Sequence, residues 1–138
     1  MSVVLIASIT ELCIADHQSR PDALGAWLAN KTPAALRAML GTPARQMYVA
    51  ERDGLVAAVG AIEPAQRLVS LNYVAPQHRF AGVSTTLLAA MEATLGSGEA
   101  RLSSTATAHD FYLRRGWADT GETDSYAGMI AFPMRKTL

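Results

Sequence analysis

The sequence YVAPQHRFAGVSTTLLAAME, residues 73–92, contains the end of a strand, a short loop and the start of a helix. The run before it, residues 68–74, is apolar with β-branched and aromatic members, and Pro76 cannot continue a sheet ladder. We therefore expect a strand that ends near Ala75. Apolar residues then recur at helical spacing until a glycine-rich stop, which predicts a helix of about three to four turns from near Gly82.

The loop between these two elements has the composition of an anion site. Arg79 supplies a cation, Gly82 a position without a side chain, and Ser84 a hydroxyl. The first turn of a helix has unpaired N–H groups and the positive end of the helix dipole, so it attracts anions. Because Gly82 lets a bulky anion approach the backbone, we expect a diphosphate here.

Composition restricts the class of protein. The 138 residues predict a single domain, 1–138, and with half of them hydrophobic and 17% charged the chain is of globular type. Twelve basic and twelve acidic residues cancel. Net charge therefore gives no reason to expect nucleic acid or an anionic membrane as a partner.

The thiol and imidazole groups are few. Cys13 is the single cysteine, so no internal disulfide can form, and three scattered histidines do not suggest a metal site; we expect no metal. The cytoplasm is the default location. Residues 3–7 are apolar but too short for a signal or membrane-spanning segment, and they predict a first strand.

Residues 8–41 have a helical pattern that predicts two or three short helices. Thr32 followed by Pro33 has the form of an N-cap with proline at the first helical position. We interpret Trp27 as a core residue of this helical layer in preference to a substrate contact. We interpret His17 as a solvated residue at a helix end.

The remaining elements follow in a regular order. Residues 46–51 and 55–62 predict a hairpin around Asp53-Gly54, with 68–74 as the third strand of an antiparallel meander. A strand at 100–104, after the long helix, is expected to pair in parallel with the third strand. Two elements then complete the chain: a helix capped by Thr107 and ended by Gly116, and a closing pair of strands formed by the segment from Trp117 onward and by Tyr126–Met134.

Two motifs in this order resemble those of the GNAT N-acetyltransferase superfamily. The first is the acetyl-CoA loop, Val74-Ala75-Pro76 followed by Arg79-x-x-Gly82-x-Ser84, where the family often has glycine in place of Phe80 and glycine or alanine in place of Ser84. The second is Ala108-x-x-Phe111-Tyr112-x-x-x-Gly116-Trp117. The C-terminal residues 133–138 also resemble the family's usual end.

The resemblance implies an α/β (α+β) architecture, the GNAT acyl-CoA N-acyltransferase fold. This fold has a mixed, mostly antiparallel central sheet of about six to seven strands flanked by helices. It also implies that residues 8–41 wall the acceptor site.

The same resemblance implies acetyl-CoA as cofactor, with CoA as the product. The pantetheine arm is expected to pair with backbone of the splayed third strand of the meander, and Thr105 lies where many relatives have an asparagine that touches this arm. The implied cofactor-binding residues are Tyr73, Val74, Ala75, Arg79, Phe80, Ala81, Gly82, Val83, Ser84, Thr85 and Thr105.

Tyr112 is the candidate catalytic residue, because the family tyrosine at this position protonates the departing thiolate. Phe111 is assigned to packing, and His109 to an exposed first turn of its helix. Many relatives carry a glutamate on the strand that here offers only Ser70 and Asn72. Two alternatives for the base stay open, Glu63 and an ordered water held by Asn72 or by backbone.

The predicted function is transfer of acetyl from acetyl-CoA to a primary amine of a small molecule or peptide. Cys13, distant in sequence from both motifs, gives no reason to expect a covalent enzyme intermediate. The alternative is a non-catalytic acyl-CoA-binding sensor or regulatory module with the same fold. The acceptor and the oligomeric state stay open, with Tyr126 and Met129 as residues for a homodimer through the last strands.

Overall fold

The structure, a computed structural model, describes residues 1–138 and is organised around one seven-stranded sheet. The order across the sheet is β1-β2-β3-β4-β7-β5, and β6 pairs with β7. All pairings are antiparallel except β3 with β4. The predicted fold class and the parallel pairing are therefore confirmed. The strands are β1 (Gln46–Arg52), β2 (Leu55–Glu63), β3 (Leu68–Val74), β4 (Glu99–Thr105), β5 (Ala118–Asp119), β6 (Asp124–Tyr126) and β7 (Met129–Thr137).

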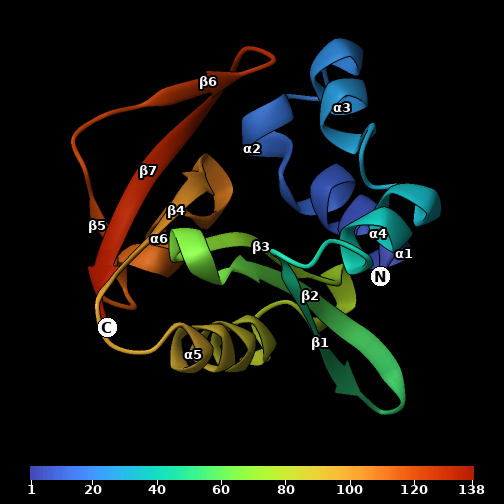
Figure 1. The fold of residues 1–138 in the computed structure, drawn as a ribbon. Coiled ribbons are helices and arrows are strands. Elements are labelled where there is room, and N and C mark those ends of the chain that lie inside the picture. The colour runs from blue at the N-terminus through green and yellow to red at the C-terminus, as the bar shows by residue number, and fades with distance from the viewer.

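Helices lie on both sides of this sheet. Figure 1 shows α5 on one side of the meander and the N-terminal helices on the other. No helix combines the length and the apolar character needed to cross a bilayer. The helices are α1 (Ser2–Ala7), a π-helical turn (Ser8–Leu12), α2 (Ile14–His17), α3 (Pro21–Leu28), α4 (Pro33–Leu40), α5 (Val83–Leu95) and α6 (Ala106–Leu113), with 3-10 turns at Pro64–Gln66 and Pro76–His78.

The meander follows the sequence pattern closely. Asp53 and Gly54 both have positive φ, 53° and 75°, as a two-residue hairpin turn between β1 and β2 requires. Gln46 pairs with Ile62 across this hairpin. The predicted helix from near Gly82 is α5, which begins at Val83.

The first predicted strand is wrong, because residues 2–7 form helix α1. Leu5 and Ile9 are fully buried and four residues apart, the spacing of one helix face that continues into the following turn. A short apolar run does not distinguish a strand from a buried helix by periodicity. Burial of Leu5 and Ile9 on one face separates the two in favour of the helix.

One predicted N-cap is confirmed and one is wrong. Thr32 caps α4, with its side chain accepting a bond from Ala35 N at 3.2 Å. The cap of α6 is Thr105 instead of Thr107, and its Oγ1 accepts from Ala108 N at 3.1 Å. Thr107 is free to bond elsewhere, since α6 begins two residues earlier than predicted.

The core divides into three clusters that fix the helices to the sheet. The largest joins α5 and α6 with β2, β3, β4 and β7. Helix α5 lies very close to β2, since a Cβ added at Gly60 would come within 2.8 Å of Met91 Sδ. A second cluster packs α1 and α4 against the sheet, and the third contains Trp27, which confirms its interpretation as a core residue. The interpretation of His17 as a solvated residue is wrong, because it is 1% exposed.

The C-terminal segment forms three strands instead of the predicted pair. β6 and β7 make a hairpin through Ala127 and Gly128, both at positive φ. This hairpin is attached to the helical layer by Tyr126 Oη, which donates to Ala26 O at 3.0 Å. The expectation that Met129 lies on a dimer surface is wrong, because it is 6% exposed and packs inside the same chain.

Candidate active site

The main cavity lies where β3 and β4 separate. The two parallel strands pair only at Leu68 with Arg101 and at Val69 with Leu102, and beyond these pairs no ladder joins them. The cavity that opens there has a volume of about 560 Å³ and is lined by both strands, the 76–85 loop region and α6. The free edge of β3 offers backbone groups to an extended guest.

The start of α5 forms one end of this cavity. Gly82 is the N-cap of α5 at φ +79°, and a Cβ placed on it would meet nothing within 4 Å. No side chain caps the helix, so the N–H groups of its first turn face open space. This geometry suits the predicted anion site.

Two arginines flank the anion loop. Arg79 lies over the Phe80 ring at 4.5 Å, and Arg115 over the Phe111 ring at 3.7 Å. Arg115 also donates to Thr85 Oγ1 through Nε at 3.0 Å and Nη2 at 2.5 Å. Sequence reasoning missed Arg115, which lies 30 residues after Thr85 of the loop. The only sequence signal for a role at the site was its place directly before Gly116 of the second motif. Together the two guanidinium groups make this end of the cavity positive.

Phe80 has an unusual conformation. It is 91% exposed and adopts φ +63°, in the left-handed region. A residue with a Cβ pays about 1–2 kcal/mol for this conformation, which explains why glycine is favoured at this place in similar loops. Phe80 lies at the rim of the cavity.

Tyr112 is a buried residue of the cavity wall. It is 6% exposed, and its ring meets the rings of Phe111 at 5.1 Å and Trp117 at 6.1 Å in edge-to-face geometry. Burial raises the pKa of Tyr112 to about 12, and hydrogen bonding with the Asn72 side chain acts in the opposite direction. The phenol is therefore protonated at neutral pH and can donate a proton.

Residues 15–138 match a family model described as an acetyltransferase (GNAT) domain. The chain belongs to the GNAT acetyltransferase family. Proteins of this family transfer an acyl group from coenzyme A, and coenzyme A suits both the positive loop and the open strand edge described above.

Solved structures agree with this fold. A GCN5-related N-acetyltransferase from Rhodopseudomonas palustris is 23% identical with a TM-score of 0.85, over 99% of this chain and 87% of that chain. The PaiA N-acetyltransferase from Thermoplasma acidophilum, in complex with coenzyme A, is 16% identical with a TM-score of 0.79, over 99% and 90%. An acyl-CoA N-acyltransferase from Pseudomonas aeruginosa is 17% identical with a TM-score of 0.61, over 87% and 86%. No curated protein sequence matches the chain.

Most of the residues that the resemblance implied are brought together around the one cavity. Two are not: Ala75 is 2% exposed and packs in the core, and Ala81 does not line the cavity. The predicted residues that do line it are Tyr73, Val74, Arg79, Phe80, Gly82, Val83, Ser84, Thr85, Thr105 and Tyr112.

Neither Glu63 nor His109 lines the cavity. Glu63 forms an ion pair with Arg45, with Nη2 to Oε1 at 2.5 Å, and its other oxygen accepts from Gln66. His109 is half-buried instead of exposed, stacked on Phe132 with its Nε2 at 2.7 Å from Asp119 Oδ1. The Glu63 carboxylate therefore lies outside the cavity lining and is already paired with Arg45.

One polar side chain of the cavity wall lacks a hydrogen-bond partner. Asn72 lines the cavity, and its Oδ1 is buried without a hydrogen-bond donor from the protein. A buried carbonyl oxygen without a partner is costly, so this atom is suited to receive an N–H or O–H from a guest. Of the two alternatives for the base, the water held by Asn72 agrees with this geometry.

The helical layer brings Cys13 to the cavity wall, although it is distant in sequence from both motifs. Burial, reinforced by the neighbouring Asp16 charge, raises the pKa of the Cys13 thiol to about 12. The thiolate is the nucleophilic form of cysteine, so this thiol is inert at neutral pH. Cys13 is close to the site, so its distance no longer argues against a covalent enzyme intermediate. The expectation that none forms rests instead on the protonated state of the Cys13 thiol.

A second buried contact joins the helical layer to α6. Asp16 Oδ1 accepts from Ala106 N at 2.6 Å, and Oδ2 accepts from Thr107 N at 3.2 Å and from Thr107 Oγ1 at 2.5 Å. Sequence reasoning missed this carboxylate, which lies 90 residues from its partners. The contact holds α2 against the start of α6 and so shapes the cavity wall.

Proposed function

We propose that the protein is an N-acetyltransferase that moves acetyl from acetyl-CoA directly to a primary amine of a small molecule or peptide. The observation that carries this proposal is the separation of β3 and β4 between an anion-binding helix start and a buried, protonated tyrosine. Acetyl-CoA supplies an acetyl group activated as a thioester. A cytoplasmic location is part of this proposal.

The chain offers binding groups for two parts of coenzyme A, the diphosphate and the pantetheine arm. The diphosphate is assigned to the N–H groups of the first turn of α5 beside Gly82, with Arg79 and Arg115 as neighbouring cations. The extended pantetheine arm is assigned to the free edge of β3. With the cofactor held in this way, the amine and the thioester react within one complex, which lowers the entropic part of the barrier.

Tyr112 is assigned as the acid that protonates the leaving sulfur. Its raised pKa keeps the proton in place until negative charge develops nearby. Asn72 Oδ1 is assigned to the amine side, where it accepts a bond from the attacking nitrogen or from a water that takes its proton. His78 and Asp110 also line the cavity, but neither is hydrogen-bonded to Tyr112 or Asn72.

The test is release of free thiol from acetyl-CoA in the presence of single amines, followed by mass spectrometry of the acceptor. We expect an acceptor that gains one acetyl group for each thiol released. Thiol release without an acetylated amine, or none with any amine, contradicts the proposal.

One observation favours a second candidate, a non-catalytic acyl-CoA-binding module. Strand β3 carries no carboxylate, only Ser70 and Asn72, so a strong base is missing at that place. This candidate gains support if acetyl-CoA binds tightly and no amine in the panel is acetylated.

A further inference from the structure

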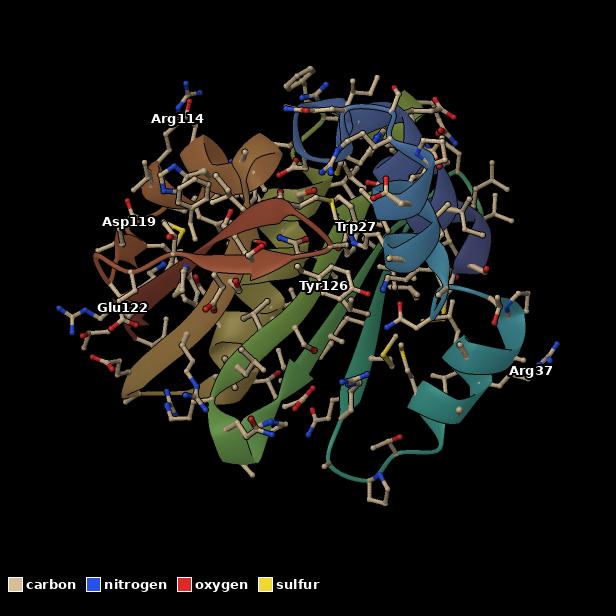
Figure 2. All side chains as sticks on the ribbon, turned by 90° about the horizontal axis from the view of Figure 1, so that it is seen from above. Trp27, Arg37, Arg114, Asp119, Glu122 and Tyr126 are labelled. Atoms are coloured by element: carbon tan, nitrogen blue, oxygen red, sulfur yellow. The ribbon has the colours of Figure 1, made fainter.

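The charged side chains of the main cavity come from only two parts of the chain. They belong to the 76–85 loop region and to α6, and they are His78, Arg79, Asp110, Arg114 and Arg115. Figure 2 shows Arg114 projecting outward from α6, whereas Trp27 of the helical layer lies in the interior. Strands β3 and β4 contribute no charged side chain to the wall. With the diphosphate assigned to the start of α5, the uncharged part of the wall is left for the acceptor.

The helical layer contributes to this uncharged wall through the π-helical turn at Ser8–Leu12. The turn and the residue after it bring Ser8, Leu12 and Cys13 to the cavity lining. The N-terminal helices, to which the turn belongs, lie on the side of the sheet opposite to α5 (Figure 1). Because π-helical turns are rare and frequently lie at functional sites, this turn is a candidate contact for the acceptor.

The carboxylates of this segment do not reach the main cavity. Glu11, inside the turn, is exposed and lies outside the cavity lining. Asp16 is buried, and both of its oxygens already accept bonds from the start of α6. A charged group on the acceptor would therefore lose its hydration at this wall without gaining a partner of opposite charge.

Tyr73 offers this wall an uncharged hydrogen-bond donor. Its side chain packs with the helical layer, and its Oη accepts from Trp27 Nε1 at 3.3 Å. An indole N–H can only donate, so the hydroxyl proton of Tyr73 is not used in this bond, and it has no acceptor within the protein. Burial raises the pKa of Tyr73 above its ordinary value, so the proton stays in place. A neutral oxygen on the acceptor suits this donor.

We propose that the acceptor is a primary amine whose remaining part is uncharged and largely apolar, and that Leu12 of the π-helical turn selects for it. Leu12 is half-buried and lines the same cavity as Asn72 and Tyr112, so one small acceptor can contact all three. In the transfer itself a C–N bond forms, the thioester C–S bond breaks, the amine loses one proton and the CoA thiol gains one. This inference rests on the proposed N-acetyltransferase function.

The experiment compares acceptors that differ in one charge at nearly constant size. L-phenylalanine is compared with L-phenylalaninol, which has a hydroxymethyl group in place of the carboxylate. 1,4-Diaminobutane is compared with 4-aminobutan-1-ol, which has a hydroxyl in place of the second ammonium. Values of kcat/KM from the thiol-release assay are calculated per concentration of unprotonated amine, which removes differences in amine basicity.

We expect kcat/KM for each alcohol to exceed that of its charged partner by at least about 100-fold. Leu12→Glu should raise kcat/KM for the diamine about 10-fold relative to its alcohol, because the new carboxylate pairs with the second ammonium. Leu12→Gln, which adds no charge, keeps the wild-type ratio within threefold. Ile14→Glu is the matched control, since Ile14 is 53% exposed on α2 and does not line the cavity. Leu12→Asp replaces the glutamate variant if that one does not fold.

Equal use of the charged and uncharged acceptors by wild type, or an unchanged ratio in Leu12→Glu, overturns the inference and leaves the proposed function intact. If no amine is acetylated, the proposed function fails, and the wall is tested by calorimetry with CoA present. The probes are then N-acetyl-L-phenylalaninol and N-acetyl-L-phenylalanine. Tighter binding of the alcohol supports an uncharged acceptor site, and equal binding or none overturns it.

Discussion

Replacing Tyr112 by phenylalanine removes one oxygen from the centre of the site. The ring contacts with Phe111 and Trp117 are kept, since they involve only the aromatic carbons. The change removes one phenolic oxygen beside Asn72, and the loss of one such polar group costs about 0.5–1.5 kcal/mol of stability. The folded state is therefore retained, and changes in rate report on the phenol.

The expected effect on catalysis is much larger than the effect on stability. Loss of a positioned general acid slows the reaction by about 10²- to 10⁴-fold, which corresponds to about 3–5 kcal/mol of barrier. Binding of CoA stays within threefold, because Tyr112 is assigned to the leaving sulfur and not to the phosphates. In wild type, loss of the acid's proton does not reduce the rate between pH 7 and about 10, since burial raises the pKa of Tyr112 to about 12.

The assay is steady-state thiol release at several pH values, combined with calorimetric titration of CoA. Tyr48→Phe is the matched control: it removes a tyrosine hydroxyl that donates to Thr94 Oγ1 at 2.8 Å, outside the cavity. The reasoning is refuted if Tyr112→Phe keeps kcat within threefold of wild type. It is also refuted if the variant loses CoA affinity in proportion to its rate.

Three further predictions follow from burial and packing. Gly60→Val adds a Cβ that would lie only 2.8 Å from Met91 Sδ, so we expect the variant to be about 1–3 kcal/mol less stable in urea unfolding. Unchanged stability contradicts the close approach of α5 to β2. Between pH 10 and 12 the folded state keeps the Tyr112 proton that the unfolded chain has released, so stability falls as pH rises, by about 2–3 kcal/mol from this group. Tyr112→Phe lacks that part of the loss, and identical pH dependence in both proteins argues against the raised pKa. Iodoacetamide should modify Cys13 slowly in the native protein and rapidly in urea, and intact-mass measurement with acetyl-CoA should show no acetylated enzyme.

The parts of the fold predicted best are those with strong local signals. The Asp53-Gly54 turn, the strands on either side of it and the loop around Gly82 depend on short-range backbone chemistry that the sequence states directly. The helix over residues 2–7 was missed because five apolar residues satisfy both periodicities, and only burial of Leu5 with Ile9 separates them.

The candidate site was predicted only in part, because several of its residues meet across long sequence separations. Asp16 finds its partners 90 residues away at the start of α6, and Arg115 reaches Thr85 across 30 residues. No local pattern indicates such pairs. Gln18 and Ser19, in the helical layer beside the site, both adopt left-handed conformations that local preference disfavours. Long-range packing overrides local preference there, and sequence reasoning has no access to it.

The central claim is that coenzyme A binds in the cavity between β3 and β4 with its diphosphate on the start of α5. Calorimetric titration of CoA and acetyl-CoA, with ATP for comparison, tests it on wild type and Gly82→Glu. Gly121→Glu is the matched control, an exposed glycine at φ +89° whose Cβ would also meet nothing within 4 Å, outside the cavity. We predict that both CoA species bind to wild type and to Gly121→Glu and bind at least about 100-fold more weakly to Gly82→Glu, since a carboxylate then faces the diphosphate. Equal affinity in the two variants, or no binding by wild type, contradicts the claim.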